Sequence, residues 1–166
     1  MTERLENLER MIRGEVPAPP IAQLIGFTLV AVKRGEAVFD FESSAKHANP
    51  MGTLHGGVLC DVADAAMGVS FASTLEDGES FTTLELKINF LRPVWSEKLR
   101  AVGKVIKRGN TVGLVECDIT NAAGVLVARS SSTCMVLRGA QASGRCVSRC
   151  EGVMGRSALP RLRKSV

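Results

Sequence analysis

Several features that define large classes of proteins are missing from this chain of 166 residues. It holds two histidines and five cysteines, and its one close cysteine pair is Cys146 with Cys150, so no spacing typical of zinc or iron–sulfur sites occurs. The number of cysteines is odd, and three of them fall within apolar patterns, which indicates buried thiols in a reducing compartment. We therefore expect no metal, no cofactor and no disulfide framework.

Apolar segments of the kind used for export or membrane insertion are missing as well. The first ten residues mix charges without a continuous apolar run. The longest uncharged run in the central helical segment, from Ala65 to Leu75, is too short to span a bilayer. These features predict a cytoplasmic protein without membrane insertion.

A surface for nucleic acid is not indicated either. The net charge is +4, yet residues 140–166 hold six Lys/Arg against one Glu, whereas residues 1–139 hold 15 Lys/Arg against 16 Asp/Glu. The positive excess thus belongs to the C-terminal tail, and the chain has no helix-turn-helix pattern. We expect no nucleic-acid partner.

What the chain does contain is a polar motif directly before an apolar helix. Residues 49–57 read Asn-Pro-Met-Gly-Thr-Leu-His-Gly-Gly, and residues 56–74 form a helical run that is apolar on nearly every face. Gly56 and Gly57 leave backbone N–H groups uncovered at the positive end of this helix, which is an arrangement that stabilises an oxyanion. Asp64 lies deeper in the same helix, and a carboxylate in apolar surroundings must be paired, protonated or catalytically active.

Each member of this group also has a structural interpretation. His55 can be a hydrogen-bonded histidine at a loop–helix junction, and the two glycines can serve tight packing or a turn with positive φ. Asp61 suits a solvated or capping position near the helix start. Asp64 is harder to explain in this way, because it lies more than a turn further in. The combination indicates electrophile activation and a carboxylate on one helix.

The pattern of elements predicts an α+β domain. Residues 1–20 read as an amphipathic helix capped by Thr2 and followed by a proline-rich linker, and residues 139–166 as a basic, mobile tail. Between them, residues 21–138 hold one short helical turn, the central helix and a set of strands. The predicted strands cover residues 27–33, 37–43, 81–91, 99–107, 111–120 and 125–137, the last three as an antiparallel meander. A curved antiparallel sheet wrapped around one long helix fits this order, and its uncovered edges predict oligomerisation.

Three segments carry a resemblance to a known family. They are Asn49-x5-His55-Gly56-Gly57-x6-Asp64, Leu86-x-Ile88-Asn89-Phe90-Leu91-Arg92-Pro93 and Gly124-x-Leu126-Val127-Ala128. Together with the order of elements, they resemble the hotdog-fold acyl-CoA thioesterases of the PaaI-like group, over residues 21–137. The resemblance implies a hotdog fold, hydrolysis of an acyl-CoA thioester, and a homodimer or homotetramer.

The resemblance also implies roles for individual residues. Asn49, His55 and the N–H of Gly56 would polarise the thioester carbonyl, while Asp64 of the facing subunit would attack it or activate water. Thr83 matches a Ser/Thr that orients the water. Strand alternation places Thr83 on the face opposite Leu84 and Leu86, where it would line a site.

The substrate is less well defined by the sequence. CoA carries phosphates that need cationic partners, and the candidates at strand ends or turns are Arg92, Lys107 and Arg108, with Gly57 as a further substrate contact. An apolar acyl site for aromatic or short-to-medium acyl groups is suggested by Met51, Leu54, Leu59 and Met67. Two other functions remain open: a hydratase or dehydratase of the same fold, in which the histidine takes the proton, and a non-catalytic acyl-CoA-binding protein.

Overall fold

The computed structural model describes residues 3–144, so the predicted Thr2 cap and residues 145–166 of the predicted tail lie outside the described residues. In chain order the elements are α1 (Glu3–Ile12), α2 (Pro20–Ile25), β1 (Phe27–Lys33), β2 (Glu36–Glu42), the 3-10 helix η1 (Ala45–His47), α3 (Gly56–Ala72), β3 (Ser80–Phe90), β4 (Lys98–Arg108), β5 (Val112–Asn121), β6 (Leu126–Leu137) and the 3-10 helix η2 (Gly139–Ala142). The predicted helices and strands are confirmed within a few residues at each end.

The six strands form one antiparallel sheet in the order β1-β2-β4-β5-β6-β3. The predicted hairpin of β1 with β2 and the meander of β4, β5 and β6 are both confirmed. Strand β3 precedes the meander in sequence but pairs with β6, so it forms the far edge of the sheet. One long side of β3 therefore has no partner strand among the described residues.

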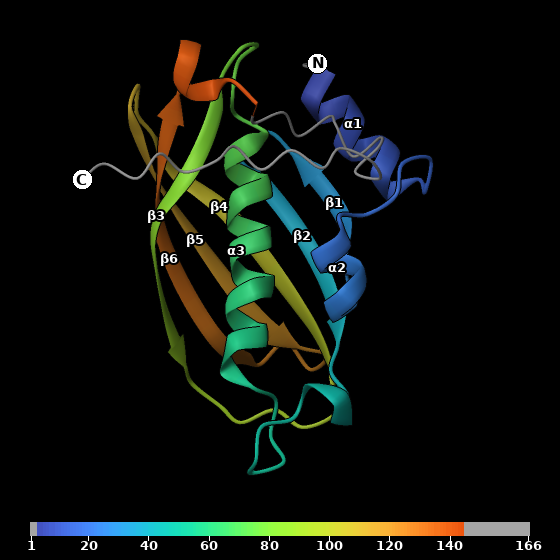
Figure 1. Ribbon diagram of the computed structural model, residues 1–166. Helices are drawn as coiled ribbons and strands as arrows, with labels where there is room; N and C mark the ends of the chain where they lie inside the picture. The colour runs from blue at the N-terminus through green and yellow to red at the C-terminus, as the bar shows by residue number, and fades with distance from the viewer. Residues whose placement is uncertain (1–2, 145–166) are drawn as a thin grey trace, which may run out of the picture.

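Helix α3 lies along one face of this sheet, which wraps around it (Figure 1), and it contacts all six strands. Its sheet-facing side is buried through Ala63, Ala66, Met67 and Phe71, each at most 1% exposed. Small residues bring the two layers close together: a Cβ atom on Gly103 of β4 would lie 2.3 Å from the carbonyl oxygen of Ala66. This close contact fixes the position of α3, and with it the motif at its start.

A β-bulge in β3 changes which face its side chains occupy. The pairing with β6 shifts between Thr83 and Glu85, so that Leu84 is the extra residue. Thr83 then pairs with Cys134 and Leu86 with Ser132, which are two residues apart on β6 and both buried. The prediction that Thr83 lies on the face opposite Leu86 is therefore wrong: both face α3, because the bulge breaks the simple alternation.

The N-terminal region packs against the β1 edge of the sheet (Figure 1). Leu8 of α1 is 4% exposed and belongs to the hydrophobic core, so this helix is anchored to the domain by burial of its apolar side. At the other end of the described chain, the residues directly after β6 form the short helix η2. No helix within residues 3–144 has the length and apolarity needed to cross a membrane.

Candidate active site

The loop before α3 is organised by Asn49. Its Oδ1 accepts hydrogen bonds from the backbone N–H of Met51 (2.9 Å) and of Thr53 (3.2 Å), and its Nδ2 donates to Thr53 Oγ1 (2.8 Å). An asparagine that hydrogen-bonds the backbone two residues ahead is a common way to hold a tight loop. Asn49 thus fixes the path of the chain into α3. One of its two amide hydrogens makes no hydrogen bond within residues 3–144 and is left as a donor.

His55 caps the N-terminus of α3. Its Nδ1 accepts the backbone N–H of Gly57 at 2.9 Å, and its own backbone N–H donates to the carbonyl of His47 at 2.9 Å. Because Nδ1 is used as an acceptor, the neutral imidazole carries its proton on Nε2. The exposed ring therefore presents a hydrogen-bond donor at the start of α3.

The N–H of Gly56 has no hydrogen-bond partner within residues 3–144. It is the first residue of α3, so its N–H also lies at the positive end of the helix dipole. Gly56 lines a cavity of about 360 Å³ together with Asn49, Leu59, Arg92 and other residues of the segment 90–94. The structure thus brings three predicted site residues, Asn49, Gly56 and Arg92, to one cavity.

Phe90 is a member of this cavity for which the sequence suggested no role. It is the last residue of β3, and a Cβ atom on Gly56 would lie 2.8 Å from its Cζ, so the tip of the ring contacts the Gly56 backbone. The side chain is nevertheless 53% exposed. Its place in the motif around Arg92 was visible in the sequence, but contact with Gly56 depends on how β3 crosses α3.

Asp64 lies further along α3 and interacts with the neighbouring strand. Thr83 Oγ1 donates a hydrogen bond to Asp64 Oδ1 at 3.3 Å. Partial desolvation raises the pKa of Asp64 above its usual value, the Thr83 bond lowers it to a lesser extent, and the negative charge of Asp61 adds a further increase. Neighbouring atoms desolvate Asp64 in part, yet its side chain remains exposed in the single chain, as does that of Asp61.

The two parts of the predicted site are separate within one chain. Gly56 and Asp64 are eight residues apart on α3, which corresponds to about 12 Å along the helix axis. A thioester carbonyl bound to the Gly56 N–H and one attacking water are too small to bridge that distance. A single chain therefore presents a donor half, at Gly56, and a carboxylate half, at Asp64 and Thr83.

Lys107 and Arg108 are placed at the opposite end of the molecule from Gly56. Arg108 lies over the ring of Phe71, near the C-terminal end of α3, at 5.2 Å from its centroid. Its Nη2 pairs with Glu79 at 2.9 Å, and its Nε is buried without a hydrogen-bond partner among the described residues. Within one chain, Lys107 and Arg108 are therefore not brought together with Arg92.

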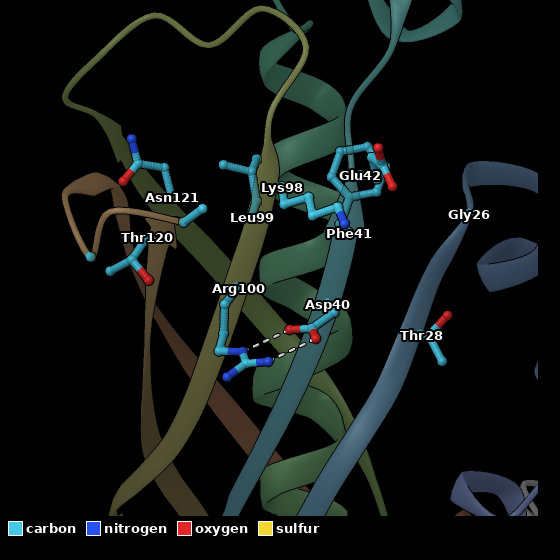
Figure 2. A pocket seen from close by; sticks show the side chains of 12 residues that line it. Gly26, Thr28, Asp40, Phe41, Glu42, Lys98, Leu99, Arg100, Thr120 and Asn121 are labelled. Carbon is cyan, nitrogen blue, oxygen red and sulfur yellow. Dashed lines mark hydrogen bonds and ion pairs between the residues drawn. The ribbon is translucent and has the colours of Figure 1, made fainter.

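A second, larger cavity of about 720 Å³ lies on the sheet face that points away from α3 (Figure 2). Asp40 and Arg100 point toward each other there and form a bidentate ion pair with distances of 2.7 and 2.8 Å. These charges satisfy each other, and none of the predicted site residues lines this cavity. Within residues 3–144, no group of three or more His, Cys, Asp or Glu side chains is placed to hold a metal ion.

Comparison with known proteins adds independent information. Residues 51–128 match the model of the thioesterase superfamily. The chain is 30% identical over 116 residues to 1,4-dihydroxy-2-naphthoyl-CoA hydrolase of Listeria monocytogenes, covering 70% of this chain and 94% of that protein. It is 27% identical over 136 residues to human acyl-coenzyme A thioesterase 13, covering 80% and 96%, respectively.

A solved structure leads to the same group. The phenylacetic acid degradation-related protein of Ralstonia eutropha JMP134 shares 35% sequence identity, with a TM-score of 0.70, over 77% of this chain and 98% of that chain. The residues matched by the superfamily model, 51–128, include Gly56, Asp64 and Thr83. The chain belongs to the thioesterase superfamily, within the PaaI-like group of hotdog-fold thioesterases.

Proposed function

We propose that this protein is an acyl-CoA thioesterase that hydrolyses aromatic or short-to-medium-chain acyl-CoA to the free acid and CoA. The observation that carries the proposal is the pair of half-sites. One is the Gly56 N–H, at a helix N-terminus and without a hydrogen-bond partner among the described residues, and the other is the partly desolvated Asp64, which accepts a hydrogen bond from Thr83. Acyl transfer to water needs these two elements, a donor for the oxyanion and a group that attacks or activates water.

The chemistry follows from these groups. The thioester carbonyl oxygen accepts hydrogen bonds from the Gly56 N–H and from Nε2–H of His55, and the free amide hydrogen of Asn49 supplies a third donor. Asp64 removes a proton from water as the water oxygen bonds to the carbonyl carbon, or its carboxylate attacks that carbon directly and is released by water afterwards. In both cases the carbon–sulfur bond breaks, and the CoA thiolate takes up a proton.

Two copies of the chain are needed to combine the half-sites. Strand β3 is one edge of the sheet and has no partner strand on its outer side within residues 3–144, and two copies paired antiparallel along this edge would continue the sheet across a two-fold axis. Phe90, at the end of β3, contacts Gly56, whereas Thr83, near its start, contacts Asp64. Antiparallel pairing therefore brings the donor half of one subunit toward the carboxylate half of the other. We propose a homodimer, or a homotetramer built from such dimers.

The state of His55 favours hydrolysis over the hydratase or dehydratase alternative. In those reactions the histidine takes a proton, which requires a free ring nitrogen that faces the substrate. Here Nδ1 accepts the Gly57 N–H, so the nitrogen left for the substrate is the protonated Nε2. This arrangement donates to a carbonyl oxygen and suits thioester polarisation.

Recognition of CoA is assigned to basic side chains around the combined site. Arg92 lines the same cavity as Gly56. Lys107 and Arg108 lie far from Gly56 in their own chain, but the antiparallel arrangement would bring this end of one subunit toward Gly56 of the other. Of the two, Arg108 is already paired with Glu79, whereas Lys107 is exposed and forms no ion pair among the described residues, so Lys107 is the better candidate for a phosphate.

The deciding experiment is an assay of free thiol release over a panel of aromatic, short-chain and medium-chain acyl-CoAs. Enzymatic release of CoA supports the proposal. Hydration of an enoyl-CoA without thiol release would establish the hydratase, and binding without turnover would establish a non-catalytic acyl-CoA-binding protein.

Among the described residues, Cys60, Cys117 and Cys134 are free thiols. These thiols support the further proposal that the enzyme works in the reducing cytoplasm.

A further inference from the structure

Phe90 lies against the backbone of Gly56, whose N–H is the proposed oxyanion donor. The ring tip contacts the Gly56 backbone, with Cζ, Cε2 and Cε1 at 2.8, 3.2 and 3.3 Å from the position of a Cβ on that glycine. A Cβ at 2.8 Å is closer than real Cβ atoms come to a neighbouring atom, so the ring leaves no room for a side chain at residue 56. Any group bound at the Gly56 N–H therefore has the ring as an immediate neighbour.

Phe90 is also largely accessible at this cavity. Phe90 lines that cavity with Asn49, Leu59 and residues 91–94, yet its side chain is 53% exposed. A large aromatic ring left half exposed at the mouth of a cavity marks a surface that contacts a ligand or a partner. Because β3 is paired with β6 at this residue, through Ala128, the backbone under the ring is held in place.

We propose that Phe90 determines acyl specificity at the carbon next to the carbonyl, admitting straight or flat aromatic acyl groups and rejecting those with a branch at a tetrahedral α-carbon. This inference rests on the proposed function. A carbonyl oxygen within hydrogen-bond distance of the Gly56 N–H leaves the carbonyl carbon, and the carbon attached to it, beside the ring. A straight acyl chain can extend past the Phe90 ring, whereas a branch at the carbon next to the carbonyl must overlap the ring or displace it.

The test compares isomeric substrates. The kcat/KM values for butyryl-CoA and isobutyryl-CoA, and for 3-phenylpropionyl-CoA and 2-phenylpropionyl-CoA, are measured for the wild type and for Phe90→Ala. We expect the wild type to favour the straight isomer and Phe90→Ala to reduce that preference at least about tenfold, as expected when steric exclusion of one carbon group is relieved. An unchanged ratio in Phe90→Ala would overturn the inference.

A matched control separates this effect from a change at the edge strand. Leu84 lies on the same strand with the same exposed fraction, 53%, but does not line the cavity. Leu84→Ala should keep the wild-type isomer ratio, and sedimentation should give the same oligomeric state for both variants. If Leu84→Ala alters the ratio as much as Phe90→Ala, the effect comes from the strand and the inference fails.

A stability measurement tests the contact without any substrate. Gly56→Ala places a methyl group against the ring of Phe90, so its cost in unfolding free energy should be smaller in a Phe90→Ala background than in the wild type. Equal costs in the two backgrounds would contradict the contact. If the wild type releases CoA from no acyl-CoA while this coupling is present, the proposed function is what has failed; if it is active with an unchanged isomer ratio, the specificity role has failed.

Discussion

At the scale of single residues, the surroundings of Asp64 differ from those of an ordinary surface carboxylate. It lies in a helix that is otherwise apolar toward the sheet, and partial desolvation raises its pKa. A raised pKa makes a carboxylate a stronger base once it is ionised, which suits proton removal from water. The hydroxyl of Thr83 holds its Oδ1 in one orientation.

Replacing this carboxylate should remove the chemical step and leave binding intact. For Asp64→Asn we expect kcat to fall at least about a hundredfold, because the base or nucleophile is lost. KM and the thermal transition should change little, since the amide has nearly the same shape. Steady-state kinetics and calorimetry measure both, and near-normal turnover would show that Asp64 is not the reactive group.

The neighbours of Asp64 should move the acid limb of the pH profile in opposite directions. The charge of Asp61 raises the pKa of Asp64, so Asp61→Asn should shift the acid limb of kcat/KM to lower pH. The bond from Thr83 lowers that pKa, so Thr83→Val should shift the limb to higher pH. A base must be ionised, and activity is lost as pH falls through its pKa. Shifts of the same sign in both variants would contradict this account.

At the scale of elements, the ends of three strands are joined by one carboxylate. Glu79, just before β3, accepts from Arg108 at the end of β4 (2.9 Å) and from Arg138 after β6 (2.5 Å), while its carbonyl accepts from Arg4 of α1 (2.8 Å). The Glu79 side chain is only 11% exposed. Burial opposes its ionisation, but the Glu76 N–H and the two arginines outweigh burial and lower the pKa of Glu79.

Loss of this carboxylate should weaken the domain in a pH-dependent way. Glu79→Gln leaves two arginines without their partner, and we expect a loss on the order of 1–3 kcal/mol in unfolding free energy at neutral pH. Because the folded pKa is lowered, the contribution is present above the unfolded pKa and disappears as pH falls through the folded value. Denaturant titrations at several pH values measure it, with exposed Glu42→Gln as the control. An equal loss at low and neutral pH would exclude the ionic contribution.

At the scale of the whole molecule, the half-sites make a defined prediction about subunit mixing. Asn49→Ala disrupts the donor half, because it removes one donor and the hydrogen bonds that hold the loop before α3. Asp64→Ala removes the carboxylate half, so each variant alone should be nearly inactive. In a refolded equal mixture half of the dimers are mixed, and each mixed dimer has one intact site of two, so about a quarter of wild-type activity should return.

The control for mixing uses two variants that damage the same half. Asp64→Ala mixed with Asp64→Asn should recover nothing, because no combination restores the carboxylate. Analytical ultracentrifugation of the wild type should give a dimer or tetramer. An active monomer, or a lack of recovery in the Asn49→Ala and Asp64→Ala mixture, would show that the site is not shared.

Much of the fold could be predicted from short-range patterns in the sequence. Alternation of apolar and polar residues defined the strands, and a long apolar run after His-Gly-Gly defined α3, because local periodicity reflects which side of an element is buried. The same signals singled out His55, Gly56 and Asp64 beside or within apolar structure, whereas the role of Asn49 was implied by the family resemblance. Hydrogen bonds of the loop and the helix cap, which involve near neighbours in sequence, match that interpretation.

Only the tertiary structure decided how distant residues meet. The bulge at Leu84 places Leu86 on the same face as Thr83, which bonds to Asp64, because one extra residue in a strand inverts the faces after it. The place of β3 at the sheet edge, and of Phe90 against Gly56, depends on the pairing of β3 with β6, some 45 residues away in the chain. Pairing and packing across such distances depend on the whole core at once, and no local pattern in one sequence encodes them.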